Sequence, residues 1–277
     1  MSGILYVVGT PIGNLGDISQ RAIDTLEQVD FIAAEDTRVT LKLLNHFNIK
    51  KPMISYFEHN KLERGEIICS RIESGENCAI VTDAGMPCIS DPGELLVKQC
   101  AERGIKTIVV PGASAVVSAL AVSGLATGRF TFEGFLSTSK KSRNEHLEQL
   151  KTEKRTMIFY EAPHKLSATL KDMYNVFGER KISIVRELTK IHEEVIRTDL
   201  KTAVERYADG SLKGEIVLVI EGAPEEKNDI EITLEQAAEI AAKYLEEGLS
   251  VSESAKKTAK ETGLKKNDIY RMIVDNA

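Results

Sequence analysis

The sequence predicts an α/β protein made of two α/β domains, with a small helical module at its C-terminal end. Three observations lead to this prediction. Strand-like apolar runs alternate with amphipathic helices along most of the chain. Three of these runs end in turns rich in Gly and Pro, at 9–14, 83–87 and 111–115. From Thr233 onward, the pattern is purely helical.

The first domain is predicted over residues 1–120, where short apolar runs alternate with helices that carry an apolar face. This alternation predicts a mostly parallel sheet with helices on both faces. A further helix is expected to open at Asp91, with this residue as its cap and Pro92 in its first turn; a catalytic role for Asp91 is the less favoured alternative. The strands are expected at 4–9, 31–34, 53–57, 79–82 and 105–110, and the other helices at 19–29, 41–47, 63–73 and 113–122.

The second domain is predicted over residues 121–222. Its strands are expected at 130–135, 156–160, 182–186, 194–198 and 215–221, and its helices at 142–150, 165–177 and 200–207. A polar segment at 222–232 indicates a linker. The helical module is predicted over 230–277, where two short helices joined through Thr262-Gly-Leu264 are similar to a helix-turn-helix.

The composition indicates a globular protein. The chain has 277 residues, of which 42% are hydrophobic, and a formal net charge of −6. It contains no apolar run of membrane-spanning length and no basic leader, so we expect a cytoplasmic protein. The cysteines form no CxxC pair, which indicates reduced core thiols and no metal site.

The three Gly/Pro-rich turns predict one ligand crevice. The carboxyl ends of parallel strands lie on one side of a sheet, and ligands bind there where the strand order reverses. The first turn is not GxGxxG, and no GxxxxGK[ST] occurs in the chain. Because the turns are nearly devoid of Lys and Arg, they suit a ligand without phosphates, such as an adenosine with an amino-acid tail.

Several longer motifs make the sequence similar to a known family. They are Gly9-Thr-Pro-Ile-Gly-Asn-Leu15, Ala34-Glu-Asp-Thr-Arg38, Val81-Thr-Asp-Ala-Gly-Met-Pro-Cys-Ile-Ser-Asp-Pro-Gly93, Val110-Pro-Gly-Ala-Ser-Ala115, Phe159-Tyr-Glu-Ala-Pro-His164 and Arg186-Glu-Leu-Thr-Lys190. Together they resemble the tetrapyrrole methylase superfamily, and within it the branch that methylates the ribose of a cytidine in small-subunit ribosomal RNA. The resemblance implies an S-adenosylmethionine cofactor in a cleft between two α/β domains, and a homodimer. An apolar helix face in a dimer would also explain the small residues of 115–121.

The resemblance also implies which residues bind the cofactor. This chain has Met86 where the superfamily's Gly-Asp-Pro loop has an Asp, so the neighbouring Asp83 would have to supply any carboxylate needed there. The expected cofactor-binding residues are Gly9, Pro11, Ile12, Gly85, Met86, Pro87, Ile89, Ser114, Ala115, Phe159 and Tyr160.

Charged residues that follow strands are the catalytic candidates, because a ribose hydroxyl needs a base or a cation that stabilises the forming alkoxide. Arg38 suits a phosphate, and His164 is a plausible base. Each candidate has an ordinary structural alternative, namely a helix start, a cap or a surface ion pair. The candidates are Arg38, Asp83, His164, Arg186 and Glu187.

The second domain is the basic part of this acidic chain. Residues 136–213 hold 16 basic and 12 acidic side chains, so RNA phosphates are expected to bind there, at Lys140, Lys141, Arg143 and Lys190. The helical module carries a possible basic face, but a three-helix packing or dimerisation element is an equally good interpretation.

Two other functions fit parts of the sequence. One is a methyltransferase that acts on a small tetrapyrrole-type acceptor. The other is a non-enzymatic RNA-binding module, for which cofactor binding would not be expected.

Overall fold

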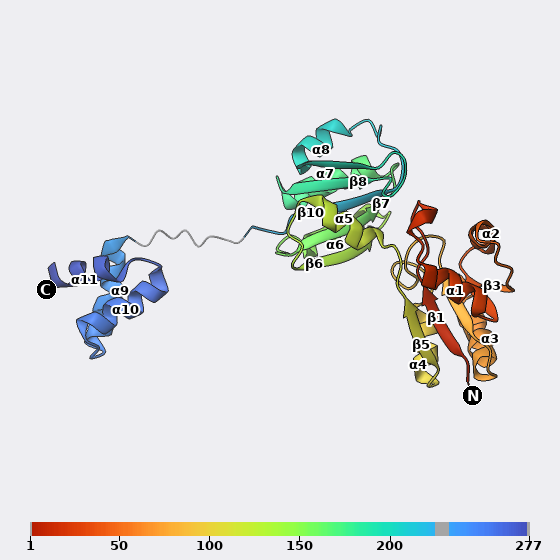
Figure 1. Ribbon diagram of the computed structural model, residues 1–277. Helices are drawn as coiled ribbons and strands as arrows, with labels where there is room; N and C mark the ends of the chain where they lie inside the picture. Colours follow the sequence, from red (N-terminus) through yellow and green to blue (C-terminus); the bar gives the residue numbers. More distant parts are fainter. Residues whose placement is uncertain (1, 225–232, 276–277) are drawn as a thin grey trace. The chain divides into compact units, whose positions relative to one another are not determined.

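The computed structural model describes residues 2–224 and 233–275, and the chain divides into two compact units, Met1–Ala223 and Pro224–Ala277 (Figure 1). Most of the linker predicted at 222–232, and the predicted start of the helical module at 230, lie outside the described residues. The two units are therefore described separately.

The first unit begins with a five-stranded parallel sheet. Its strands are β1 (Ile4–Val8), β2 (Phe31–Ala34), β3 (Met53–Ser55), β4 (Cys78–Val81) and β5 (Lys106–Val110), in the order β3-β2-β4-β1-β5. All five lie where the sequence predicts them, with no end shifted by more than two residues.

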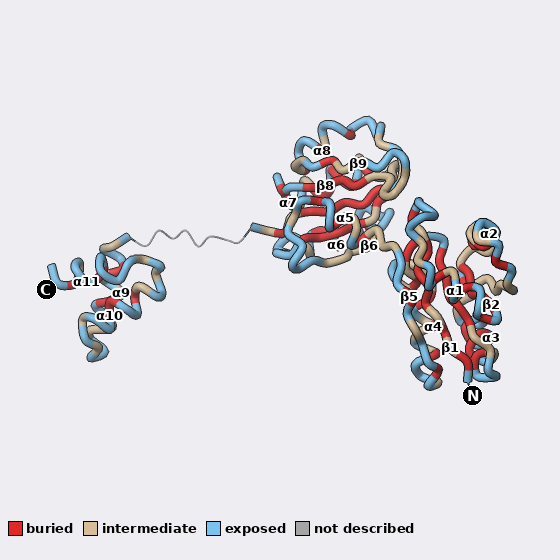
Figure 2. The backbone as a smooth tube through the Cα atoms, viewed as in Figure 1, coloured by how far each residue is buried: buried red, intermediate tan, exposed pale blue. Residues whose placement is uncertain are grey.

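Helices cover both faces of this sheet. Helices α1 (Gln20–Gln28) and α2 (Thr37–His46) pack on one face, and α3 (Lys61–Glu73) and α4 (Glu94–Glu102) pack on the other. Along β2, Phe31 faces the second pair of helices and Ile32 faces the first pair. Because both faces are covered, the central strands are apolar at nearly every position, and they are drawn as buried in Figure 2.

The strand order reverses between β1 and β4. The chain leaves β1 towards β2 on one side, whereas β4 connects to β5 on the other side. The two strand-ending loops are tied together there, because Thr10 and Gly85 exchange backbone hydrogen bonds with N–O distances of 2.9 and 3.2 Å. The short helix η1 (Leu15–Asp17) follows the first loop. This is the place in an open parallel sheet where a ligand crevice is expected.

A second five-stranded sheet follows, with strand order β6-β7-β10-β8-β9. Only β6 and β7 are parallel to each other, and the other neighbouring strands are antiparallel. Helices α6 (Lys140–Gln149), α7 (Leu166–Phe177) and α8 (Leu200–Arg206) cover one face. The strands are β6 (Phe130–Phe135), β7 (Thr156–Glu161), β8 (Lys181–Arg186), β9 (Glu194–Asp199) and β10 (Ile216–Ile220).

Helix α5 (Ala115–Ser123) covers the other face of the second sheet, although it follows β5 of the first sheet. Its residues Val116, Ala119 and Leu120 pack against Ile158 and Val217. The domain boundary predicted at residue 120 falls inside this helix. The division of the first unit into two domains at that residue stays a prediction.

The second unit is a bundle of three short helices, α9 (Leu234–Glu246), α10 (Val251–Thr262) and α11 (Lys266–Asp275). Capping boxes at Thr233 and Ser250 start the first two helices. Gly263, in the left-handed conformation, ends α10 and allows the chain to turn into α11, as the sequence predicts. The unit has its own hydrophobic core, formed by Ala237, Ala241, Ala255, Ile269 and Ile273.

One capping prediction is wrong. Helix α4 begins at Glu94, and its N-cap is Gly93, so Asp91 does not cap it. Gly93 has a φ of 137°, which a residue with a side chain rarely adopts, and the chain therefore enters the helix later than a Ser-Asp-Pro-Gly sequence suggests. Within the described ranges, no helix is long and apolar enough to span a membrane.

Candidate functional site

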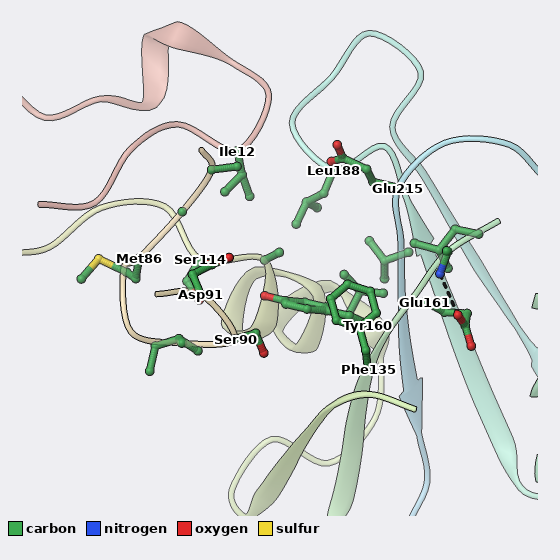
Figure 3. Close-up of a pocket in the computed structure, with 18 of the residues that line it drawn as sticks. Ile12, Met86, Ser90, Asp91, Ser114, Phe135, Tyr160, Glu161, Leu188 and Glu215 are labelled. Atoms are coloured by element: carbon green, nitrogen blue, oxygen red, sulfur yellow. Dashed lines mark hydrogen bonds between the residues drawn. The ribbon is translucent and has the colours of Figure 1, made fainter. Parts of the chain in front are cut away.

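A pocket of about 380 Å³ lies at the carboxyl ends of the first sheet and is closed by residues of the second sheet (Figure 3). Its volume is within the range of about 300–1,000 Å³ typical of small-molecule sites. The walls are mainly apolar. The lining residues are Ile12, Ala84, Gly85, Met86, Ile89, Ser90, Asp91, Ser114, Ala115, Phe135, Tyr160, Glu161, Ala162, Pro163, Val185, Leu188, Glu215, Ile216 and Val217.

The three predicted loops converge on this pocket. They contribute Ile12 after β1, Gly85 and Met86 after β4, and Ser114 and Ala115 after β5. Ile89, in the loop before α4, also lines the pocket, as does Tyr160 of β7. These residues are all among those that the sequence analysis assigns to cofactor binding.

Gly9, Pro11 and Pro87 do not line the pocket, but Gly9 supports its shape. A Cβ atom on Gly9 would lie 2.7 Å from the Cα of Gly112, and a Cβ on Gly112 would lie 2.8 Å from the Cα of Gly9. The β1 and β5 loops can approach this closely because neither residue has a side chain.

Phe159 does not line the pocket either, although the sequence analysis assigns it to the cofactor site. Successive side chains of a strand point to opposite faces of the sheet. Tyr160 packs on the α5 face, next to the pocket, whereas Phe159 is fully buried in the core beneath α6 and α7. The two neighbouring residues therefore cannot both contact the ligand.

The pocket is acidic. The residues that line it, all from the described part of the chain, include the acidic Asp91, Glu161 and Glu215 but no Lys, Arg or His. Glu161 is buried and accepts hydrogen bonds from the Thr169 hydroxyl at 2.5 Å and the Ala162 backbone N–H at 2.8 Å. Such a pocket disfavours an anionic ligand and favours one that carries positive charge.

A first polar cluster lies at the ends of β2 and β4. Asp36 caps α2 and pairs with Arg38, whose side chain is 86% exposed. The hydrogen bond that the Arg38 guanidinium donates to Asp36 is the main reason why the pKa of Asp36 is lowered to about 2. Asp83 accepts a hydrogen bond from the backbone N–H of Asp36 at 3.1 Å, and burial together with the charge of Glu35 raises the pKa of Asp83. Asp83 does not line the pocket, so it does not replace the carboxylate that Met86 lacks.

A second polar cluster lies at the ends of β8 and β10. Glu187 accepts hydrogen bonds from the backbone N–H of Glu215 at 2.8 Å and from the Lys190 ammonium at 3.0 Å. Burial acts to lower the pKa of Lys190, but its bonds to Glu187 and Glu215 outweigh burial and raise it. Arg186 lies beside Glu194, with an N–O distance of 3.7 Å. Glu187 therefore holds Lys190 and the rim of the pocket in place.

His164 and the predicted RNA contacts occupy different surroundings. His164 is exposed and directly follows two pocket residues, Ala162 and Pro163. Lys140 and Lys141 are exposed in the first turn of α6.

Arg143, in contrast, is only 11% exposed and donates two hydrogen bonds to Asp172, at 2.6 and 2.8 Å. We therefore remove Arg143 from the predicted RNA contacts, because its guanidinium is already bound inside the protein.

Asp91 is the pocket residue that the sequence analysis interpreted differently. It is one of the residues that line the pocket, and burial is the main reason why its pKa is raised to about 6. The negative charges of Glu35 and Asp83 add to this effect, and a hydrogen bond from Thr82 opposes it. The sequence Ser-Asp-Pro-Gly is typical of a helix start and gives no sign of a pocket residue.

Comparison with known proteins agrees with this arrangement. The family model described as tetrapyrrole (corrin/porphyrin) methylases matches residues 4–204, which include both sheets except β10. The chain belongs to the tetrapyrrole methylase family. These matches confirm the family, the α/β fold and the methyltransferase class that the motifs predict.

Two relatives within the family show how far the similarity extends. A protein of Synechocystis named ribosomal RNA small subunit methyltransferase I is 47% identical over 275 residues, which is 99% of this chain and 98% of the relative. A protein of Thermotoga maritima with the same name is 47% identical over 220 residues, which is 79% of this chain and 99% of the relative. A relative of that length has room for a unit like 1–223, but not for a second unit as well.

A solved family member supports the fold. The uroporphyrin-III C-methyltransferase of Thermus thermophilus, crystallised with S-adenosylhomocysteine, is 13% identical and covers 79% of this chain and 97% of its own, with a TM-score of 0.56. At this identity, the likeness concerns the fold.

Proposed function

We propose that this protein methylates the ribose 2′-hydroxyl of a cytidine in small-subunit ribosomal RNA, in the cytoplasm and as a homodimer. The observation that carries the proposal is the similarity over 99% of the chain to a protein named ribosomal RNA small subunit methyltransferase I. The methyl donor is S-adenosylmethionine, in keeping with the family.

The pocket fits this cofactor. S-adenosylmethionine has no phosphate and carries a sulfonium and an ammonium group, so an acidic pocket without basic side chains suits it. Gly85, Met86, Ser114 and Ala115 would hold it from the first sheet, and Tyr160 from the second. An aromatic ring beside a cation adds a favourable interaction. When bound, the cofactor supplies an activated methyl group.

The charged clusters beside the pocket would position the RNA. In-line transfer depends on alignment of the reacting atoms, and a phosphate held on each side of the target ribose would fix its hydroxyl. Arg38, which is exposed, and Arg186 are suited to this role because guanidinium groups bind phosphates well. Asp83 and Glu187 would orient these clusters, and exposed His164 could contact the nucleotide.

Further RNA contacts are proposed at the surface of the second sheet and in the helical unit. Lys140, Lys141 and Lys190 would bind phosphates near the pocket. In the helical unit, Lys256 and Lys266 are exposed, and Lys266 donates to Ser252 at 3.0 Å, so α10 and the start of α11 share a basic surface. We favour RNA binding over a purely structural role, because the unit already buries its own apolar core.

The homodimer proposal is supported by an apolar surface. Helix α5 has apolar side chains around most of its circumference, and Val117 and Val122 remain exposed although the helix packs on the second sheet. Val109 on β5 is also exposed. Light scattering of the purified protein should give twice the chain mass, and Val117→Asp should shift it towards the monomer; a monomeric wild type would contradict the proposal.

The experiment that tests the activity is methyl transfer from labelled S-adenosylmethionine to small ribosomal subunits that lack their own modifications, followed by nuclease mapping. We expect the label on the ribose of one cytidine. Ser114→Tyr, which fills the pocket, should abolish both labelling and S-adenosylhomocysteine binding. Ser70→Tyr, on the exposed face of α3, is the matched control and should retain both RNA labelling and S-adenosylhomocysteine binding. Cofactor binding without RNA labelling would instead indicate a small-molecule acceptor.

A further inference from the structure

Helix capping does not account for the position of Asp91. It lies in the loop between β4 and α4, and it lines the pocket together with Ser114 and Tyr160. It does not cap α4, whose N-cap is Gly93 without a side-chain hydrogen bond. In Figure 3, the Tyr160 side chain extends from β7 towards the Asp91 loop.

The backbone around Asp91 is held in an unusual conformation. Cys88 and Ser90 have φ angles of 73° and 64°, and Gly93 has a φ of 137°. A left-handed conformation at a residue other than Gly costs about 1–3 kcal/mol and persists only where the surrounding structure imposes it. A Cβ on Gly93 would also lie 2.7 Å from the sulfur of Cys88, so the loop is closely packed. The position of Asp91 at the pocket is therefore specified by the fold.

The charges around Asp91 leave its carboxylate without a compensating cation. Among the ion pairs of the described residues, none involves Asp91. The groups that face it are Glu35 at the end of β2, Asp83 after β4, Tyr160 on β7 and, in its own loop, Cys88. A carboxylate in these surroundings has an increased affinity for a proton.

Tyr160 is kept as a neutral hydroxyl. Burial and, after it, the charge of Asp91 raise the pKa of Tyr160 to about 12. At neutral pH, the pocket thus presents a carboxylate that can accept a proton and a phenol that can only donate one. A base is most effective when its pKa is near the working pH, and a value of about 6 for Asp91 meets this condition.

We propose that Asp91 is the catalytic base that accepts the proton of the acceptor hydroxyl. The proposal rests on the proposed function. As the acceptor oxygen forms its bond to the methyl carbon, the hydroxyl proton passes to an Asp91 carboxylate oxygen. The electron pair of the broken carbon–sulfur bond stays on sulfur, so a neutral thioether and a methyl ether result.

The test compares wild type, Asp91→Asn and the control Glu102→Gln, which removes a carboxylate from the exposed surface of α4. We expect Asp91→Asn to lower single-turnover methyl transfer by about 10²–10⁴-fold. Its affinity for S-adenosylhomocysteine, measured by calorimetry, should change less than about threefold, because this thioether lacks the sulfonium charge that the Asp91 carboxylate would attract. The wild-type rate should fall as the pH drops through about 6, and the variant should lose this dependence.

A second variant separates a base from a residue that only shapes the pocket. Asp91→Ala should recover part of the rate when formate is added, because a small carboxylate can occupy the space and take the proton. The proposal would be overturned if the rate of Asp91→Asn kept the pH dependence of wild type. It would also be overturned if the affinity of this variant for S-adenosylhomocysteine fell in proportion to its rate. If wild type does not label RNA, the proposed function itself is contradicted. If wild type labels RNA and Asp91→Asn labels it equally fast, only the proposed role of Asp91 is contradicted.

Discussion

Asp91 is expected to carry its charge at a cost to the folded state. Its pKa is raised from 3.8 to about 6, so between these values the folded protein binds more protons than the unfolded chain. Stability therefore falls as the pH rises through this window. Asp91→Asn, which cannot ionise, should have a higher melting temperature than wild type at pH 7.5. The difference should shrink towards pH 4, where wild-type Asp91 is neutral. Calorimetric scans at both pH values check this, and a variant that is less stable at pH 7.5 would contradict it.

Arg143 illustrates the opposite case, a charge that the folded state needs. Arg143→Met would leave the buried Asp172 carboxylate without its partner, and this kind of loss typically costs about 3–5 kcal/mol. Urea unfolding followed by circular dichroism should show the change. Lys141→Met, two residues earlier on the same helix and 85% exposed, should change stability by less than about 0.5 kcal/mol. Similar stabilities for the two variants would mean that the Arg143–Asp172 pair contributes little.

Sequence reasoning is weakest at this scale. By sequence alone, Arg143 and Lys141 are equivalent, because both are basic residues in the same segment. Their difference depends on Asp172, which is 29 residues away in the chain and belongs to α7. The sequence Asp-Pro-Gly predicts a helix cap at Asp91, because its local preferences are strong. Its place in the pocket follows from tertiary packing that a single sequence does not display.

At the scale of elements, the strand-ending loops are the most predictable part of the site. Apolar strands that stop at Gly and Pro locate the carboxyl edge of a parallel sheet from local information alone. The seven predicted cofactor residues that line the pocket all come from these loops, the segment before α4, or β7. Phe159 was misassigned because residues on neighbouring positions of a strand face opposite sides, and the sequence does not state which side meets the pocket.

The contact between the β1 and β5 loops gives a prediction for these elements. Gly112→Ala would place a methyl group 2.8 Å from the backbone of Gly9, so the two strand ends would have to separate. We expect at least a tenfold loss of S-adenosylhomocysteine affinity and a lower melting temperature. Gly128→Ala is the matched control, because nothing lies within 4 Å of its added methyl group. An unchanged affinity in Gly112→Ala would show that the pocket does not depend on this close approach.

At the scale of the whole molecule, the two compact units are expected to be functionally separable. A chain that ends after Ala223 keeps the complete pocket and has nearly the length of the Thermotoga relative. It should bind S-adenosylhomocysteine as tightly as the full chain. Its affinity for small ribosomal subunits should be several-fold weaker, with a smaller dependence on salt, because it lacks the basic surface of α10 and α11. Calorimetry and filter binding at two salt concentrations measure both quantities.

Equal RNA affinity in the truncated and full-length chains would leave the helical unit with a structural role only. A charge-neutralising control is available in the full chain, since Lys256→Gln with Lys266→Gln should reproduce the RNA defect and leave the three-helix core intact. The helices of this unit could be predicted from their apolar spacing and capping residues. Its binding partner could not be predicted, because acidic side chains outnumber basic ones by ten to seven over residues 229–277 and hide the local basic surface.

The path of the chain through α5 determines where this enzyme can be divided into fragments or joined to a relative. The strand before it belongs to the first sheet, whereas the helix itself supplies the apolar layer of the second. A fragment that starts at residue 121 would lack most of that layer and should be insoluble. A cut within the short 111–114 segment would give each half its own complete packing. Chimaeras between family members should exchange α5 together with the second sheet, although it is encoded next to the first.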